Sequence, residues 1–151
     1  MKFKDLISKI EKFRVNENTE EFEINIFFDE IGEKILLLNS LTESQKRSLI
    51  RKLFEFLKNQ NSEMEENFSF IHLIESIDNS NYEVYNNELF KFNSENGTIT
   101  SILLLNRHIN SLNGKELENC TELMKSISEN SNYSEFIRNY ALDFYKYQLK
   151  K

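Results

Sequence analysis

Apolar residues recur along most of the chain at the spacing of one helix face. Phe3, Leu6, Ile7, Ile10 and Phe13 begin this pattern, with steps of three and four residues. Seven later segments repeat it, at about 22–39, 42–58, 62–77, 82–92, 98–112, 117–127 and 133–148. The pattern predicts an all-α fold of about eight helices.

The segment 22–39 also fits a strand over its first part, because apolar residues alternate with polar ones from Phe22 to Phe28. Over the longer span the helical period fits better, so we interpret the segment as a helix. Gly32 lies inside it and weakens that helix by about 1 kcal/mol relative to alanine. A glycine at this place is expected where two helices cross closely.

Helix starts and turns are marked by a few polar residues. T-E-S-Q at 42–45 and S-E-M-E at 62–65 are capping boxes, and the second is expected to open the central helix. Thr98 or Thr100 is expected to cap the sixth helix. Gly97 suits a left-handed turn, and Asn113-Gly114 marks another turn.

The connections between helices are short, and the chain has three glycines and no proline. Short connections predict antiparallel neighbours. Residues 1–151 are the right length for one helical domain. Four helix pairs of about 35–40 residues would stack as a short α-solenoid of the HEAT-like kind, and an irregular helical bundle is the alternative.

The charge is acidic, with a net value of −6, and it is uneven. Residues 15–33 and 59–90 contain no lysine or arginine and seven acidic residues each. This balance argues against nucleic acid and against an anionic membrane as partners, since both attract basic proteins. It favours a basic protein partner, whose approach an acidic field accelerates. A merely solubilising surface is the alternative.

The residues predicted to bind a partner come from these two base-free segments. We expect acids at the start of the second and fourth helices to form one rim, with a tyrosine as an aromatic anchor. The predicted binding residues are Glu20, Glu23, Asp29, Glu30, Glu63, Glu66, Tyr82 and Glu83.

Two apolar stretches carry charged residues that are costly to bury without partners. The first, 68–78, contains His72 and Glu75, and the second, 103–111, contains Arg107 and Asn110. We predict that these four side chains form a structural polar core in which Glu75 pairs with Arg107. A metal site is not expected, because His-x-x-Glu occurs once and in the reverse order of the di-iron motif.

No sequence motif makes a positive case for an enzyme. There is no glycine-rich phosphate loop and no G-x-S-x-G, and the lone Cys120 has no local partner for a nucleophilic dyad. No cofactor and no small-molecule substrate are expected. The first residues carry charges throughout, unlike a signal peptide, so the expected location is cytoplasmic.

The stretch F-S-F-I-H-L-I-E-S-I-D, then Y-x-x-Y, then L-L-L-N-R-H-I-N-S resembles small helical immunity proteins of bacterial polymorphic-toxin and contact-dependent growth inhibition systems. The matching residues are His72, Glu75, Arg107, Asn110 and Ser111, over roughly the middle third of the chain. The resemblance implies a cytosolic protein that binds the C-terminal domain of one cognate toxin, often a basic nuclease, and blocks it stoichiometrically.

Two other functions stay open from the sequence. One is a helical-repeat adaptor that binds another cytosolic protein or peptide. The other is an enzyme or metal protein built on a helical bundle. The sequence lacks most of the metal ligands and the catalytic motif that such a protein would need.

Overall fold

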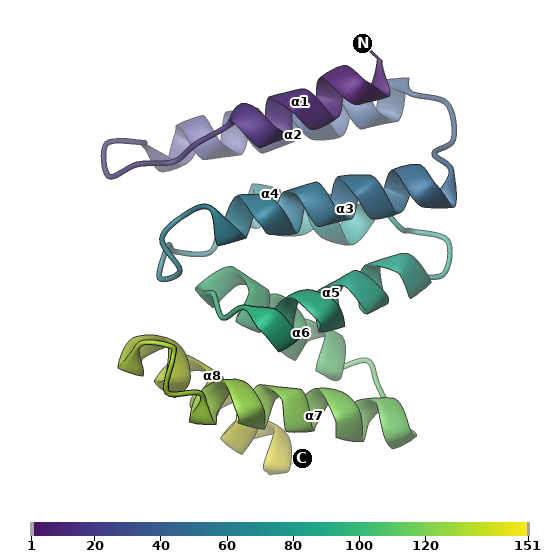
Figure 1. Ribbon diagram of the computed structural model, residues 1–151. Helices are drawn as coiled ribbons and strands as arrows, with labels where there is room; N and C mark the ends of the chain where they lie inside the picture. Colours follow the sequence, from purple (N-terminus) through teal and green to yellow (C-terminus); the bar gives the residue numbers. More distant parts are fainter. Residues whose placement is uncertain (1, 151) are drawn as a thin grey trace. The chain divides into compact units, whose positions relative to one another are not determined.

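The computed structural model describes residues 2–150, and these fold into eight α-helices without a strand (Figure 1). The helices are α1 (Phe3–Lys12), α2 (Glu21–Leu37), α3 (Glu43–Lys58), α4 (Phe68–Ser76), α5 (Glu83–Glu95), α6 (Ile99–Ile109), α7 (Gly114–Glu129) and α8 (Glu135–Leu149). The all-α prediction is confirmed, and so is the choice of helix over strand at 22–39. In the described part of the chain, no helix is both long enough and apolar enough to cross a membrane.

The contacts divide the chain into two compact units. Unit 1 comprises Met1–Gln60 and Glu66–Glu88, and unit 2 comprises Asn61–Glu65 and Leu89–Lys151. The division falls within α5, so this helix contributes to both units. The prediction of a single domain over 1–151 stays a prediction.

Unit 1 consists of two helical hairpins stacked in two layers. Helix α1 packs on α3, and α2 packs on α4, as the upper part of Figure 1 shows. This arrangement is typical of an α-solenoid. In unit 2, α6 contacts both α7 and α8, and those two contact each other, which is the packing of a small irregular bundle. Each unit therefore corresponds to one of the two architectures predicted from the sequence.

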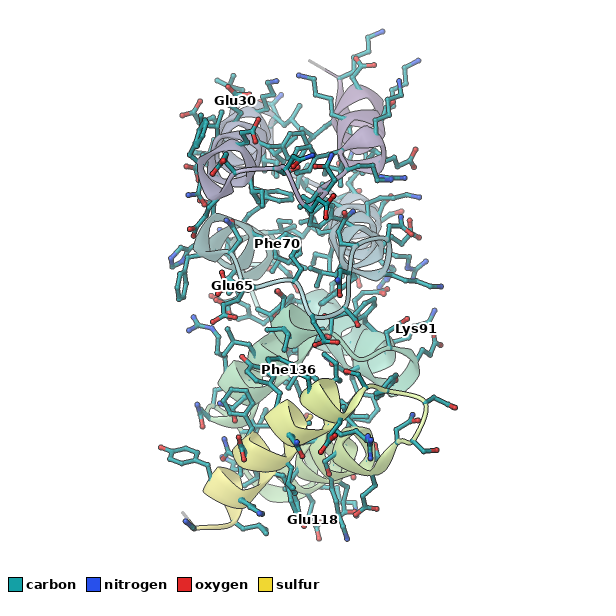
Figure 2. The ribbon with its side chains drawn as sticks, turned by 90° about the vertical axis from the view of Figure 1, so that its left-hand side faces the viewer. Glu30, Glu65, Phe70, Lys91, Glu118 and Phe136 are labelled. Atoms are coloured by element: carbon teal, nitrogen blue, oxygen red, sulfur yellow. The ribbon has the colours of Figure 1, made fainter. Side chains whose placement is uncertain are left out.

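The core of unit 1 is a cluster of phenylalanine rings centred on Phe28 of α2. Its ring lies 5.1 Å from the rings of both Phe56 on α3 and Phe70 on α4, and 5.6 Å from Phe13 at the end of α1. Phe70 points between the two layers in Figure 2. The edge-to-face geometry of these contacts is the arrangement that aromatic quadrupoles favour. One residue thus joins all four helices of the stacked hairpins.

Unit 2 has an aliphatic core, in which Ile102, Leu105, Met124 and Ala141 are fully buried. Gly97 matters here for a reason other than the predicted one. Its backbone is not left-handed: among the described glycines, the positive φ occurs at Gly114, with a value of 62°, and not at Gly97. Instead, a Cβ on Gly97 would lie 2.9 Å from the ring of Tyr133, so only glycine lets the ring approach.

Side-chain caps mark the starts of α3, α4 and α6, and the structure corrects one of the predicted caps. Thr42 accepts a hydrogen bond from the Gln45 N–H at 3.1 Å, as predicted, and Thr98 caps α6. The predicted box at 62–65 does not open α4. The cap is Asn67, whose Oδ1 accepts from the Phe70 N–H at 3.0 Å.

The later start of α4 has a tertiary cause. The Asn67 amide is buried and donates to Asn25 Oδ1 of α2 at 2.7 Å, so this cap is tied to the neighbouring helix. A capping box at Ser62 would supply only local hydrogen bonds.

The aromatic cluster generates the first prediction. Phe28→Ala should lower the free energy of unfolding of unit 1 by about 3–5 kcal/mol, because it leaves a cavity where four helices meet. Phe22→Ala is the matched control on the same helix, since Phe22 is 61% exposed. Urea denaturation followed by circular dichroism measures both variants. Equal losses for the two variants would contradict the central role of Phe28.

Candidate protein-binding groove

Helix α2 presents a second apolar surface opposite its buried face. Ile24, Phe28 and Ile31 face the core of unit 1. On the solvent side, the exposed fractions are 61% for Phe22, 51% for Ile26, 83% for Leu36 and 85% for Leu37. Phe68 on the neighbouring helix α4 is also exposed. Clustered exposed apolar side chains of this kind mark interaction surfaces.

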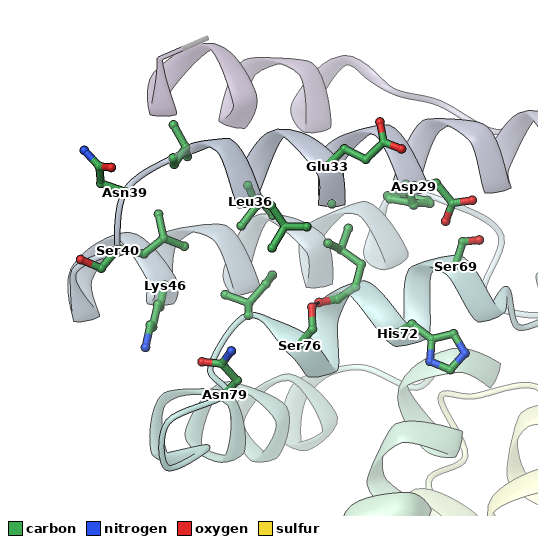
Figure 3. A pocket seen from close by; sticks show the side chains of 17 residues that line it. Asp29, Glu33, Leu36, Asn39, Ser40, Lys46, Ser69, His72, Ser76 and Asn79 are labelled. Atoms are coloured by element: carbon green, nitrogen blue, oxygen red, sulfur yellow. Dashed lines mark hydrogen bonds between the residues drawn. The ribbon is translucent and has the colours of Figure 1, made fainter.

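A groove of about 670 Å³ lies between α2 and α4, entirely within unit 1, and of these exposed apolar residues Leu36 lines it. The residues that line it recur every three or four positions on each helix, so each wall is one helix face. Figure 3 shows Asp29, Glu33 and Leu36 along α2, with Ser69, His72 and Ser76 along α4. The loop after α2 closes one end with Asn39 and Ser40.

The floor of the groove is apolar and rests on the aromatic cluster. Phe28, Leu73 and Ile77 line it, and all three are buried. Gly32 also lines it, and a Cβ on Gly32 would lie 3.7 Å from Leu73 Cδ1, which is an ordinary contact distance. Gly32 therefore lies at the α2–α4 contact, as predicted, but without a clash that requires glycine.

The charged side chains in the groove that have no ion-pair partner among the described residues are acidic. Among the described residues, Asp29 and Glu33 form no ion pair. The one lysine in the lining, Lys46, lies 3.7 Å from the buried carboxylate of Asp78 and 3.4 Å from Ser80 Oγ. The groove therefore presents a net negative charge beside apolar surface.

Asp78 also fixes the start of α5. Its Oδ2 accepts hydrogen bonds from the backbone N–H groups of Val84 at 2.8 Å and Tyr85 at 3.1 Å. These are orphan donors in the first turn of the helix, so Asp78 caps α5 from a position several residues upstream. The lysine at the end of the groove is thus paired with a carboxylate that has a structural role.

Most of the basic residues of α3 form ion pairs with carboxylates of unit 1. Arg51 forms two hydrogen bonds with the buried carboxylate of Glu88, at 2.6 and 3.3 Å, which raises the pKa of the Arg51 guanidinium. Lys52 contacts Glu11 at 3.0 Å and Glu55 at 3.1 Å, and these hydrogen bonds raise the pKa of its ammonium group. Unit 1 therefore separates a basic helix, most of whose charges are paired, from Asp29 and Glu33 on α2, which form no ion pair among the described residues.

Four of the predicted binding residues lie together on α2 or at its start: Glu20, Glu23, Asp29 and Glu30. All are exposed, and Figure 2 shows Glu30 on the outside of the helix. Asp29 lines the groove. Glu23 also has a local task, because its Oε2 accepts from the Glu20 N–H at 2.6 Å.

The other predicted binding residues lie outside α2, and the prediction that they form one rim with the α2 acids stays a prediction. Glu63 and Glu66 precede α4 and lie in different units, so they do not mark a helix start. Glu66 is half-buried. Tyr82 and Glu83 are exposed at the start of α5, and Tyr82 has a φ of 61°. What the structure corrects is the start of α4, which was expected at Ser62 and follows Asn67 instead.

The prediction that four polar side chains are buried in the core is wrong. His72, Arg107 and Asn110 are exposed, and Glu75 is half-buried. Asn110 instead accepts a hydrogen bond from Gln148 Nε2 of α8 at 2.9 Å. Helix α4 buries one face, and His72 lies off it. Helix α6 is buried nearly all round, and Arg107 and Asn110 lie exposed toward its C-terminal end. The pairing of Glu75 in unit 1 with Arg107 in unit 2 stays a prediction.

Asn106 of α6 also contacts α8, since its Oδ1 accepts a hydrogen bond from the same Gln148 amide at 2.7 Å. No cluster of three metal-ligating side chains occurs among the described residues. His72 lines the groove, and its ring lies 6.3 Å from that of Phe68.

The sequence did not reveal the groove, nor the exposure of Leu36, which lines it, and of the neighbouring Leu37. A signal was present, since α2 carries more apolar residues than one buried face can hold. The apolar residues from Phe22 to Phe28 alternate as in a strand because α2 carries two apolar stripes on opposite sides. Ile24 and Phe28 belong to the buried stripe, and Phe22 and Ile26 to the exposed one.

Comparisons with protein-family models, curated proteins and solved structures found no match to this chain.

The environment of Cys120 gives a prediction about its reactivity. Burial raises the pKa of the Cys120 thiol and lowers the pKa of the His108 imidazole, so both groups are held in their neutral forms. At pH 8, iodoacetamide should therefore alkylate Cys120 much more slowly in the folded protein than in urea, as measured by mass spectrometry. Faster alkylation in the folded state than in urea would instead indicate an activated thiol.

Proposed function

We propose that this protein is an immunity protein that binds a basic toxin domain in the cytoplasm and blocks it stoichiometrically. The observation that carries the proposal is the α2 face, where unpaired acids stand beside exposed apolar side chains. A binding protein needs such a surface, because apolar contacts slow dissociation and charges speed association. The motif resemblance supplies the class of partner.

The distribution of charge supports a basic partner. Helix α2 contains five acidic residues and one lysine, Lys34. Most of the bases of α3 are paired with carboxylates outside this face, among them Arg51 with Glu88 and Lys52 with Glu11. An unscreened acidic surface of this kind steers basic proteins at low salt.

A helical-repeat adaptor is the competing proposal, favoured by the stacked hairpins of unit 1. An adaptor would bind a cytosolic partner without relieving toxicity. Co-expression with the C-terminal domain of a toxin encoded next to this protein separates the two functions: an immunity protein restores growth and co-purifies with the toxin domain in a fixed ratio.

The acids of α2 should govern the association rate. The triple variant Asp29→Lys, Glu30→Lys and Glu33→Lys is expected to slow association with the toxin domain about tenfold and to flatten its salt dependence. Stopped-flow fluorescence at several salt concentrations measures this effect. An association rate that ignores both salt and the substitutions would contradict electrostatic steering by α2.

The matched control carries the same change of charge in unit 2. Glu118, Glu122 and Glu129 are exposed on α7. Their replacement by lysine should leave the association rate within about twofold of the unmodified protein, because none of these residues belongs to the α2 face that the proposal assigns to the partner. Unchanged circular dichroism in both triple variants shows that folding is intact.

A further inference from the structure

We propose that the groove between α2 and α4 binds a basic amphipathic helix of the partner, whose apolar side chain seats over Gly32. This inference rests on the proposed function and names the element of the partner that is recognised. It follows from the shape of the walls, the hydrogen-bonding state of their backbones, and the charge along one side.

The walls favour a helix over an extended segment. An extended peptide usually gains affinity by pairing its backbone with the edge of a sheet. Here both walls are helices, whose backbone N–H and C=O groups are already bonded internally. A helix satisfies its own backbone groups and contributes only side chains, so it can lie between two helix faces without stranding polar atoms.

The dimensions fit a short helix. The α2 wall runs from Asp29 to Leu36, which is about two turns or roughly 11 Å of helix. Ser69 to Ser76 covers an equal length of α4. A partner helix of two to three turns therefore spans the groove.

Gly32 provides the point of closest approach. It lacks a side chain in the middle of the α2 wall, one turn after Asp29 and one turn before Leu36. A leucine, isoleucine or phenylalanine of the partner can reach Leu73 there, in the manner of an anchor residue filling a pocket. The space over Gly32 is thus an apolar position within a charged frame.

Charge complementarity makes the partner helix basic. Asp29 and Glu33 are one turn apart on the same wall, and the described residues supply neither with an ion-pair partner. Lysines or arginines one turn apart on the partner helix would face them. Lys46, at the opposite end of the groove, is already held by Asp78 and does not repel such a helix.

The test uses a peptide of about four helical turns, made of leucine and lysine with the leucines on one face. We expect it to shift the amide resonances of Gly32, Leu36, Ser69 and Leu73 in ¹⁵N-labelled protein. Two control peptides have the same composition in scrambled order, or glutamate in place of lysine. Equal binding of the scrambled peptide, or shifts confined to other helices, would overturn the proposal.

Gly32→Leu is the decisive variant. The new side chain fills the groove from its floor, while the helix gains up to about 1 kcal/mol of intrinsic propensity, so folding is retained. Affinity for the leucine–lysine peptide should fall about tenfold or more, equivalent to at least about 1.4 kcal/mol. An unchanged affinity, with the melting temperature preserved, would exclude the site over Gly32.

The same variant separates failure of this inference from failure of the proposed function. If Gly32→Leu binds and neutralises the toxin domain normally, the groove is not the toxin-binding site although the immunity function stands. If the peptide binds in the groove and Gly32→Leu abolishes that binding, but no toxin domain is neutralised, the groove stands and the immunity function fails.

Discussion

The packing of Phe28 is the constraint on which unit 1 depends. Its ring contacts rings from α1, α3 and α4, so the two hairpins share one aromatic core. The same residue lines the floor of the groove. The floor of the groove is therefore part of the close-packed core, and such cores are rigid. A rigid floor reduces the entropy lost on binding, which is the benefit of preorganisation.

The second organising feature is the sorting of charge between the two layers of unit 1. On the α1–α3 layer, Arg51 and Lys52 bind carboxylates at hydrogen-bond distance. On the α2–α4 layer, Asp29 and Glu33 have no such partners in the part of the chain that the structure describes. Because paired charges cancel at a distance, α2 contributes more to the acidic field of unit 1 than α3 does.

Two misplacements show why tertiary contacts override local signals. The capping box at Ser62 is a good helix start by sequence, but Asn67 starts α4 because its amide also reaches Asn25 of α2. His72 lies in an apolar stretch and was expected in the core. It is exposed because α4 buries only the face that carries Phe70, Ile71 and Ile74. In both cases packing against a neighbouring helix decides the outcome: where α4 begins, and which of its faces is buried.

The amino-acid sequence by itself determined the helical class, the number of helices, and several of their caps, since periodicity and capping are local properties. It also placed Asp29 and Glu30 among the binding candidates, because a base-free segment is visible in the order of residues. Only the tertiary structure decided which face of α2 is buried. The residues of the groove come from segments about forty positions apart, and their juxtaposition depends on how α2 packs on α4. That packing is set by the aromatic cluster, whose geometry no single segment encodes.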